Sequence, residues 1–278
     1  MKNHVKNQHY VPQFLLKNFS SRGNKFIWAF DKNEKYRLRN QIKERPIKKV
    51  ASENFFYDQF ENNKTGSYEY DLQRAEDLTA PIIDKIKKTK NILDLSEEER
   101  KTLSFFITLQ SLRTKGQLLR TETSMKTLSK QLNDKANIEI PSFDFKSTWF
   151  WMLEESISFY DILMKKVWML CESDNSFLIS DNPVTLINTT DKSENRGTLG
   201  LDSYGIEIYL PLSPSLTLCL FCEKFFIDRG YNKKYIPNLN YELENVRLLN
   251  SLQVAYSERF VFSHKNDFEL VKKQLKIL

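Results

Sequence analysis

Apolar residues recur at helical spacing through the middle of the chain. Within 67–88 the apolar positions fall three or four residues apart, the period of one helix face; they are Leu72, Ala75, Thr79, Ile82, Ile83 and Ile86. Ser96 and Glu99 have the spacing of a capping box, which predicts a second helix from there to about Leu119. A polar helix is expected to continue to Asn133.

Short apolar runs between turn residues dominate both ends of the chain, which is typical of strands. Near the start, KFIWAFD (25–31) predicts a strand, and NFFYD (54–58) ends a second β-rich stretch. A last helix of the middle section is expected over 146–164. The elements expected after it are strands in VWMLCES, SFLISD, PVTLIN, EIYLPL and LTLCLFCEKFFI, a loop over 189–204, a helix over 238–257, a strand in RFVFS and a helix over 267–277.

Separate runs of helices and strands predict an α+β fold. We expect a helical middle section, 66–165, packed on an antiparallel sheet within 166–278, with a basic motif, short strands and loops in 1–65. A length of 278 residues is within the range of one large domain. The three sections are therefore expected to form a single domain, 1–278.

The composition is that of a globular chain, with 40% hydrophobic and 28% charged residues. It contains no run of about 18 apolar residues, the length that suggests a membrane-spanning helix. The first residues also lack the apolar stretch of a secretory signal. Cys219 and Cys222 lack the second ligand pair of a zinc site, and together with Cys171 they suit a reducing compartment. We therefore expect a cytoplasmic protein without membrane contacts.

Positive charge is concentrated at the start of the chain. The net charge is +6, but residues 1–50 hold 13 Lys or Arg and 3 Asp or Glu, a net of +10, which leaves −4 for the other 228 residues. Such a segment is the footprint expected for a nucleic-acid partner. The densest basic cluster, and the candidate for backbone contacts, comprises Lys43, Arg45, Lys48 and Lys49. The alternative is a merely compositional excess in a Lys-rich chain.

The first candidate site residue is His9, in QHYVPQFLLKNF. Pro12 excludes a helix interior, so His9 is expected on a rigid extended segment. Histidine has a side-chain pKa near neutrality, which suits it to proton transfer. Gln8 and Asn18 surround it with polar groups. The alternative is a histidine that simply hydrogen-bonds the backbone.

A second candidate lies where an apolar helix stripe turns polar while still facing inward. The stripe that includes Ile107 continues at the same spacing to Gln110 and Arg113. A buried arginine is costly unless its donors find partners, and its planar fork suits a carboxylate or a phosphate. Glu76 shares a polar stripe with Glu69 and could pair with Arg113. A structural ion pair and a solvated helix face are the respective alternatives.

Two more polar residues are placed where apolar neighbours predict burial. Asp181 follows the strand-like SFLIS, and the junction of a strand and a turn is a common location for site residues. The same SDNP sequence is equally typical of an Asx turn before proline. Asn250 falls on the apolar stripe of the helix over 238–257, so it needs a polar network to join.

Several motifs with well-defined chemistry are missing from the sequence. It has no Gly-rich phosphate loop, no H-E-x-x-H and no G-x-S-x-G. Glu207 lacks the following Lys of a D…(D/E)-x-K nuclease core, and three His argue against a multi-histidine metal site. We expect no cofactor and no metal, with a carboxylate-bound Mg²⁺ as the open alternative.

Together these segments resemble domain-of-unknown-function family 4238. The resemblance covers nearly the whole chain and rests on QHYVPQFLLKNF, Glu69 and Glu76 as E-x₆-E, Gln110, Arg113 and Thr114 as Q-x-x-R-T, ISDNPV at 179–184, LPLSP at 210–214 and the Asn250 helix ending in RFVFS. Its H-x-x-P element is the most specific part. The family is mostly bacterial and phage-borne, and some members are linked to anti-phage protection. The resemblance thus implies a role in defence without fixing a reaction.

We expect one composite site built from His9, Gln110, Arg113 and Asp181, supported by Gln8, Asn18, Glu76 and Asn250. The leading hypothesis is a nuclease, with RNA as the favoured substrate. In it His9 moves a proton, Arg113 stabilises the phosphate, and Asp181 orients His9 or a metal. The alternatives are an enzyme that attacks a nucleotide such as NAD, and a non-enzymatic sensor that binds a phage component or small ligand in the same pocket.

Overall fold

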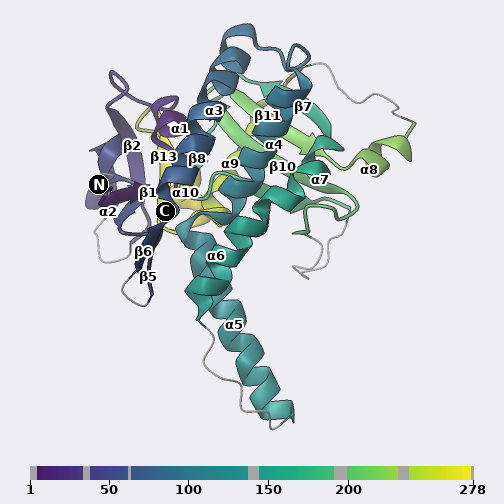
Figure 1. Ribbon diagram of the computed structural model, residues 1–278. Coiled ribbons are helices and arrows are strands. Elements are labelled where there is room, and N and C mark those ends of the chain that lie inside the picture. Colours follow the sequence, from purple (N-terminus) through teal and green to yellow (C-terminus); the bar gives the residue numbers. More distant parts are fainter. Residues whose placement is uncertain are drawn as a thin grey trace.

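The computed structural model describes residues 5–33, 38–61, 64–136, 144–190, 199–230 and 238–276. Its architecture is α+β, as the sequence pattern predicts. Figure 1 shows two long helices, α3 (Glu69–Thr89) and α4 (Glu97–Leu112), with the N-terminal strands on one side and a five-stranded sheet on the other. One hydrophobic core includes residues from all three parts.

The five-stranded sheet has the strand order β12-β7-β11-β10-β9. Its strands are β7 (Val167–Glu172), β9 (Thr185–Asn188), β10 (Ile206–Ser213), β11 (Leu216–Phe221) and β12 (Leu239–Asn240). All neighbours are antiparallel except β12 and β7. Alternate residues of β7 and β11 face the core beneath the long helices, and the others form a second cluster on the opposite face.

A four-stranded antiparallel sheet joins the two ends of the chain in the order β3-β2-β13-β8. Its strands are β2 (Phe26–Asp31), β3 (Ile42–Pro46), β8 (Ile179–Ser180) and β13 (Phe260–Ser263). Two ribbons complete the strands: β1 (Asn7–His9) with β4 (Ser52–Asn54), and β5 (Asp58–Glu61) with β6 (Lys64–Ser67). Sequence patterns predict β2, β8 and β13 but not β3, and they do not predict that β2 and β13 pair across more than 200 residues.

The helix predicted over 67–88 is confirmed as α3, and its six stripe residues are all buried. The capping box at Ser96 is also confirmed. The continuous helix expected to about Leu119 is wrong, because α4 ends at Leu112 and α5 (Lys115–Ala136) begins after a break. The Thr114 hydroxyl accounts for this break: it accepts from the backbone N–H of Gln117 and donates to Asn182.

Three other predicted elements are corrected by the structure. NFFYD comprises the last residue of β4, a turn over 55–57 in which Phe55 takes a left-handed conformation with φ of 56°, and the first residue of β5. LTLCLFCEKFFI divides into β11 and the short helix α8 (Glu223–Ile227). The stretch 146–164 divides into α6 (Phe145–Glu155), a 3-10 turn and α7 (Tyr160–Met164).

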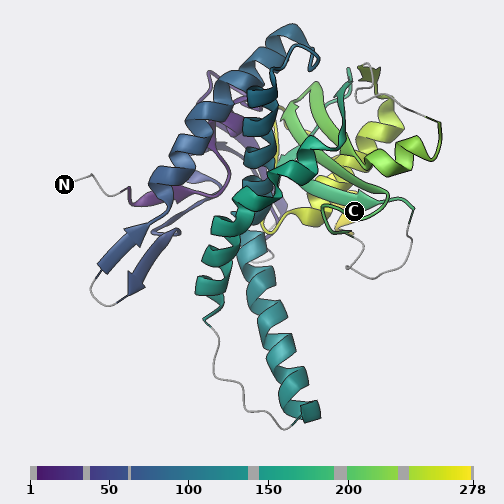
Figure 2. The same ribbon diagram turned by 45° about the vertical axis from the view of Figure 1, so that its right-hand side comes forward.

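The remaining helices are short except α9 (Leu243–Tyr256). The short ones are α1 (Gln13–Lys17), α2 (Leu38–Gln41), the 3-10 turn η1 (Ile47–Lys49) and α10 (Glu269–Gln274). Figure 2 shows α5 projecting from the body, with α6 alongside its first part. None of the helices within the described ranges combines the length and apolar character needed to cross a membrane.

Candidate functional site

Arg113 stands at the centre of a buried polar network. It lies in the break between α4 and α5, and it is 1% exposed. Its Nη2 donates to the backbone oxygen of His9 and to Glu76 Oε1, both at 2.7 Å, and its Nε donates to the Tyr57 hydroxyl at 3.2 Å. One guanidinium group therefore connects β1, α3 and the turn before β5 to the end of α4.

The pairing of Glu76 with Arg113 that the sequence suggests is confirmed. Burial alone would lower the pKa of Arg113, but the Tyr57 hydroxyl and the Glu76 carboxylate raise it. The guanidinium group is therefore charged inside the protein. Tyr57 in turn donates its hydroxyl to the backbone oxygen of Arg113 at 2.9 Å, so the two side chains hold each other in place.

Gln8 extends the network towards β5. Its Oε1 accepts from the backbone N–H of Tyr57 at 2.6 Å, and its Nε2 donates to Asp58 Oδ1 at 2.7 Å. The side chain is fully buried. Gln8 thus supports the position of Tyr57.

His9 lies on β1 and is 8% exposed. Burial lowers the pKa of its imidazole to about 4; a hydrogen bond to the backbone of Ile47 opposes the shift, and the Arg113 charge adds to it. The ring is therefore neutral at neutral pH. Its Nε2 is buried and has no hydrogen-bond partner in the described part of the chain. The Ile47 bond fixes the ring, and Nε2 is left as a proton acceptor.

Glu69 lies at the start of α3, on the same side as Glu76. Burial raises the pKa of Glu69 to about 7, against the effect of the Arg113 charge; the Glu76 and Asp58 carboxylates raise it further. At neutral pH the group is therefore protonated about half of the time. A carboxyl group with this pKa can give up or take a proton under physiological conditions.

Four buried atoms of this network have no hydrogen-bond partner among the residues that the structure describes: His9 Nε2, Gln110 Oε1, Arg113 Nη1 and Glu69 Oε2. The other end of Gln110 is engaged, because its Nε2 donates to the backbone oxygen of Tyr10 at 3.0 Å. Buried polar atoms are nearly always paired, so such an atom calls for a water, a ligand or a catalytic role. His9 Nε2 can act as a base, Gln110 Oε1 as a hydrogen-bond acceptor, Arg113 Nη1 as a cationic donor, and the Glu69 carboxyl group as an acid.

Asp181 is buried at 1% exposure but forms a separate cluster. Its two carboxylate oxygens accept from the backbone N–H groups of Glu258, Arg259 and Phe260 at 2.8–2.9 Å. Burial raises the pKa of Asp181 to about 6, and these three hydrogen bonds oppose the shift. The carboxylate thus holds the start of β13. Among the described residues no hydrogen bond joins it to His9, so the structure does not place it in the Arg113 network.

The other two supporting residues also lie outside the network. Asn18 accepts from the Lys87 ammonium group, between α1 and α3. Asn250 on α9 accepts from the backbone N–H of Leu178 at 2.8 Å and donates to the backbone oxygen of Ser176 at 2.9 Å. Asn250 therefore fixes the segment before β8, which gives the buried amide the polar partners that the sequence demands.

The four residues of the basic cluster lie on β3 and η1. Lys43, Lys48 and Lys49 are exposed, as a surface for a polyanion requires. Arg45 instead pairs with the buried Asp31 at 3.3 Å, and its guanidinium group lies over the Phe260 ring. Arg45 therefore has a structural partner, and the three lysines are the more accessible charges.

Sequence reasoning missed two members of the network. Tyr57 gives no signal, because it lies in a turn and its hydroxyl function depends on Arg113, 56 positions away. Glu69 is visible on the polar stripe of α3, but the sequence alone does not tell it from a solvated residue. Burial, which follows only from the tertiary structure, distinguishes Glu69 from a solvated residue of the same stripe.

The model of the family described as "Protein of unknown function (DUF4238)" matches residues 7–267, which is nearly the whole chain. The chain belongs to the DUF4238 family. The match begins within β1, so it includes His9, Arg113 and the Asp181 turn alike. No curated protein and no solved structure matches this DUF4238 chain.

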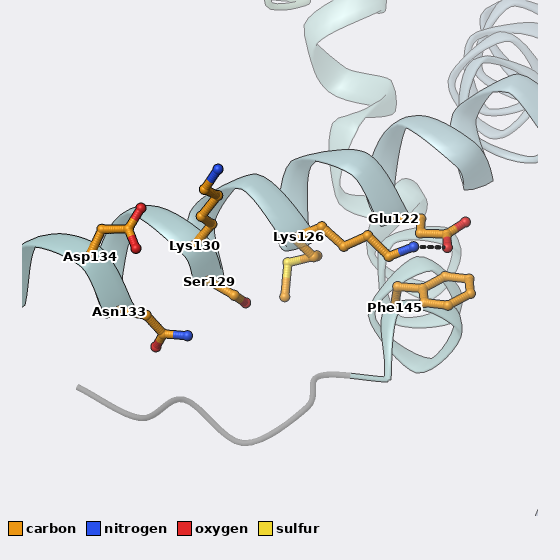
Figure 3. Close-up of a pocket in the computed structure, with 8 residues that line it drawn as sticks. Glu122, Lys126, Ser129, Lys130, Asn133, Asp134 and Phe145 are labelled. Carbon is orange, nitrogen blue, oxygen red and sulfur yellow. Dashed lines mark hydrogen bonds and ion pairs between the residues drawn. The ribbon is translucent and has the colours of Figure 1, made fainter. Parts of the chain in front are cut away.

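No three His, Cys, Asp or Glu side chains gather as a possible metal site in the described segments of this DUF4238 protein. A cavity of about 440 Å³ lies along α5, and its lining includes Phe145 and the ion pair of Glu122 with Lys126 (Figure 3). Most of the Arg113 network is buried, and it reaches the protein surface at Glu76, whose side chain is 22% exposed.

Proposed function

We propose that this DUF4238 protein is a nuclease that cleaves RNA at the Arg113 network and acts as an effector of anti-phage defence. The observation that carries the proposal is a neutral imidazole and a titratable carboxyl group that are both affected by the charge of one buried guanidinium group, each of the three groups having a buried atom without a hydrogen-bond partner in the described part of the chain. Environments that separate the pKa values of two groups are how enzymes assign an acid and a base.

His9 is the proposed base. Its Nε2 removes the proton from the 2′-hydroxyl of a ribose, and the resulting alkoxide attacks the adjacent phosphorus. The bond from phosphorus to the 5′-oxygen of the next nucleotide breaks. The products are a 2′,3′-cyclic phosphate and a 5′-hydroxyl. A pKa of about 4 keeps His9 unprotonated and ready to accept this proton at neutral pH.

Glu69 is the proposed acid. It gives its proton to the departing 5′-oxygen, and the free Nη1 of Arg113 stabilises the negative charge that develops on the phosphate. The remaining nitrogens of Arg113 are already bound to Glu76, His9 and Tyr57, which fixes the direction of the free amino group. A fixed donor costs no reorganisation during the reaction. Gln110 Oε1 is available to accept a hydrogen bond from a ribose hydroxyl.

The exposed lysines are positioned to guide the RNA backbone. Ile47, whose backbone binds the His9 ring, precedes Lys48 and Lys49 in η1. The backbone oxygen of Lys48 also accepts from Asn7 at the start of β1. These contacts attach the basic surface to the strand that carries His9. RNA binding would then weaken strongly as the salt concentration rises, because each phosphate that a lysine neutralises releases its counterions.

The test is cleavage of end-labelled RNA by purified wild type, His9→Ala and His264→Gln, beside DNA of the same sequence. We expect RNA cleavage with 2′,3′-cyclic phosphate ends, and a loss of about 10²–10⁴-fold in His9→Ala. His264 is the matched control, because its charged neighbours are Lys265 and Asp267 rather than Arg113. Equal cleavage of DNA, or full activity in His9→Ala, would falsify the mechanism; NAD consumption without RNA cleavage would favour the nucleotide-directed alternative.

A further inference from the structure

A second cluster of reactive groups lies on the face of the five-stranded sheet that is turned away from α3 and α4. Cys171 on β7 and Cys219 on β11 are both fully buried there, and their Sγ atoms are 3.1 Å apart. Both are free thiols. Cys222, the third cysteine, lies just beyond β11 and belongs to the main core instead.

The strand register explains why the two thiols meet. β7 and β11 are antiparallel, with Cys171 opposite Thr217 and Cys219 opposite Met169. The two cysteines are therefore diagonal neighbours on one face of the sheet, close enough for side-chain contact. Both lie on hydrogen-bonded strands in the interior of the sheet, so their approach is a property of the fold rather than of a loop.

Tyr241 connects this thiol pair to a cavity. It packs against the cluster that contains both cysteines. Burial raises the pKa of the Cys219 thiol, the neighbouring Cys171 raises it further, and the Tyr241 hydroxyl opposes that rise. Tyr241 also lines a polar cavity of about 260 Å³ together with Glu172 and Ser173. Tyr241 thus belongs both to the lining of this cavity and to the residues packed against the two thiols. A thiol must become a thiolate to react, and the Tyr241 hydroxyl is a group that opposes the burial-raised pKa of Cys219.

We propose that Cys171 and Cys219 are a redox-active pair that closes to a reversible disulfide when a peroxide enters. One thiolate attacks a peroxide oxygen, the O–O bond breaks, and a sulfenic acid and water form. The second thiol then attacks that sulfur and releases another water. Two thiols and one hydrogen peroxide give one disulfide and two waters, and a reducing thiol reverses the change. This inference is independent of the proposed nuclease activity.

Closing the pair would link two central strands and enclose 49 residues, from Cys171 to Cys219. A cross-link over a loop of this length stabilises the folded state, which predicts a rise in Tm of about 10 °C. The protein would thus be more stable to heat under oxidising conditions than under reducing ones.

The experiment treats the folded full-length protein with dilute hydrogen peroxide, then blocks and maps its thiols after denaturation. We expect the three reactive thiols to fall to one, Cys222, with an intact mass lower by two hydrogens and full recovery under dithiothreitol. Cys222→Ala should still form the bond, Cys171→Ala should not, and Tyr241→Phe should form it more slowly. The proposal would be overturned by three blockable thiols after treatment, by a bond to Cys222, or by oxidation to sulfinic acid in place of a disulfide. Peptide mapping of the wild-type protein decides between these outcomes even if a variant does not fold.

Discussion

The Arg113 network and the Asp181 turn are two buried polar clusters that sequence patterns select on similar grounds, yet their hydrogen bonding differs. Asp181 directs both oxygens to three backbone N–H groups at the start of β13. The Arg113 network joins four segments and still leaves four buried atoms without a partner in the described ranges. A saturated cluster stabilises the fold, whereas one with unused atoms has capacity for a ligand.

The strongest test of this comparison is Arg113 itself. Arg113→Ala leaves the Glu76 carboxylate and the Tyr57 hydroxyl without their buried partner, so we expect a loss of about 3–5 kcal/mol in the free energy of unfolding. Arg113→Lys should lose nearly as much, because an ammonium group lacks the planar fork that reaches three partners. Denaturant titration measures both. Arg22→Ala is the control, since its exposed pair with Glu44 should contribute less than about 1 kcal/mol; a Lys variant as stable as wild type would show that charge alone is sufficient.

Asp181 provides the contrasting case. Asp181→Ala removes the acceptor of three buried N–H groups, and we expect a loss of about 2–4 kcal/mol. RNA cleavage per folded molecule should stay close to that of wild type, because the carboxylate has no described contact with His9. Unfolding curves and cleavage rates normalised to the folded fraction check this. A stable Asp181→Ala protein without activity would show that Asp181 is needed at the catalytic site.

The contrast also shows where sequence reasoning succeeds. The polar positions on inward-facing stripes at Gln110, Arg113 and Asn250 are predicted from helical spacing, and all three are buried. The α+β class and most helices follow from periodicity in the same way. Local spacing specifies which face of an element is buried, and so which polar residues need partners.

Pairing between distant segments is what the sequence leaves undetermined. The four-stranded sheet combines β2 with β13, and nothing in either strand specifies the other. Asp181 has the local sequence of a site residue, but its partners at 258–260 become visible only when β8 and β13 pair. Glu69 and Glu76 share one stripe, and only the tertiary structure raises the pKa of Glu69 by burial and pairs Glu76 with Arg113.

The junction between the two clusters is sensitive to a single methyl group. A Cβ at Gly116 would lie 2.4 Å from Asn182 Nδ2, and Asn182 also binds Thr114 beside Arg113. Gly116→Ala should therefore destabilise by about 1–3 kcal/mol through overpacking, although the same change in an exposed helix stabilises. Thermal unfolding checks the sign, with Gly116→Ala in an Asn182→Ala background as the control. A stabilised single variant would mean that Asn182 moves freely.

The raised pKa of Glu69 predicts how stability changes with pH. The folded state holds this proton more tightly than the unfolded chain, so the associated stability is full below about pH 4.5 and is lost as pH rises through about 7. Glu69→Gln cannot titrate and should flatten that decline by about 1–2 kcal/mol, allowing for partial solvent screening. Unfolding at pH 5 and pH 9 measures it. Glu155→Gln, an exposed change on α6, should leave the decline as in wild type; an unchanged slope in Glu69→Gln would place the titration elsewhere.

The smallest effect on stability is expected on the basic surface. Lys48→Glu with Lys49→Glu should change the free energy of unfolding by less than about 0.5 kcal/mol, because both side chains are exposed. RNA binding should nevertheless weaken for every sequence, with a flatter dependence on salt. Fluorescence anisotropy at several salt concentrations measures this, with Lys88→Glu on α3 as the matched charge change. An equal loss in both proteins would indicate net charge rather than a defined surface.

The most direct test of an acid–base site at the Arg113 network is the pH dependence of single-turnover RNA cleavage. The reaction needs His9 without a proton, which holds above about pH 4, and Glu69 with one, which holds below about pH 7. We predict a bell-shaped dependence of the cleavage rate on pH, with the rate falling below about pH 4 and above about pH 7. In Glu69→Gln the rate should be lower, and it should no longer fall at alkaline pH. A rate that keeps rising above pH 8 in wild type, or an unchanged profile in Glu69→Gln, would contradict the account.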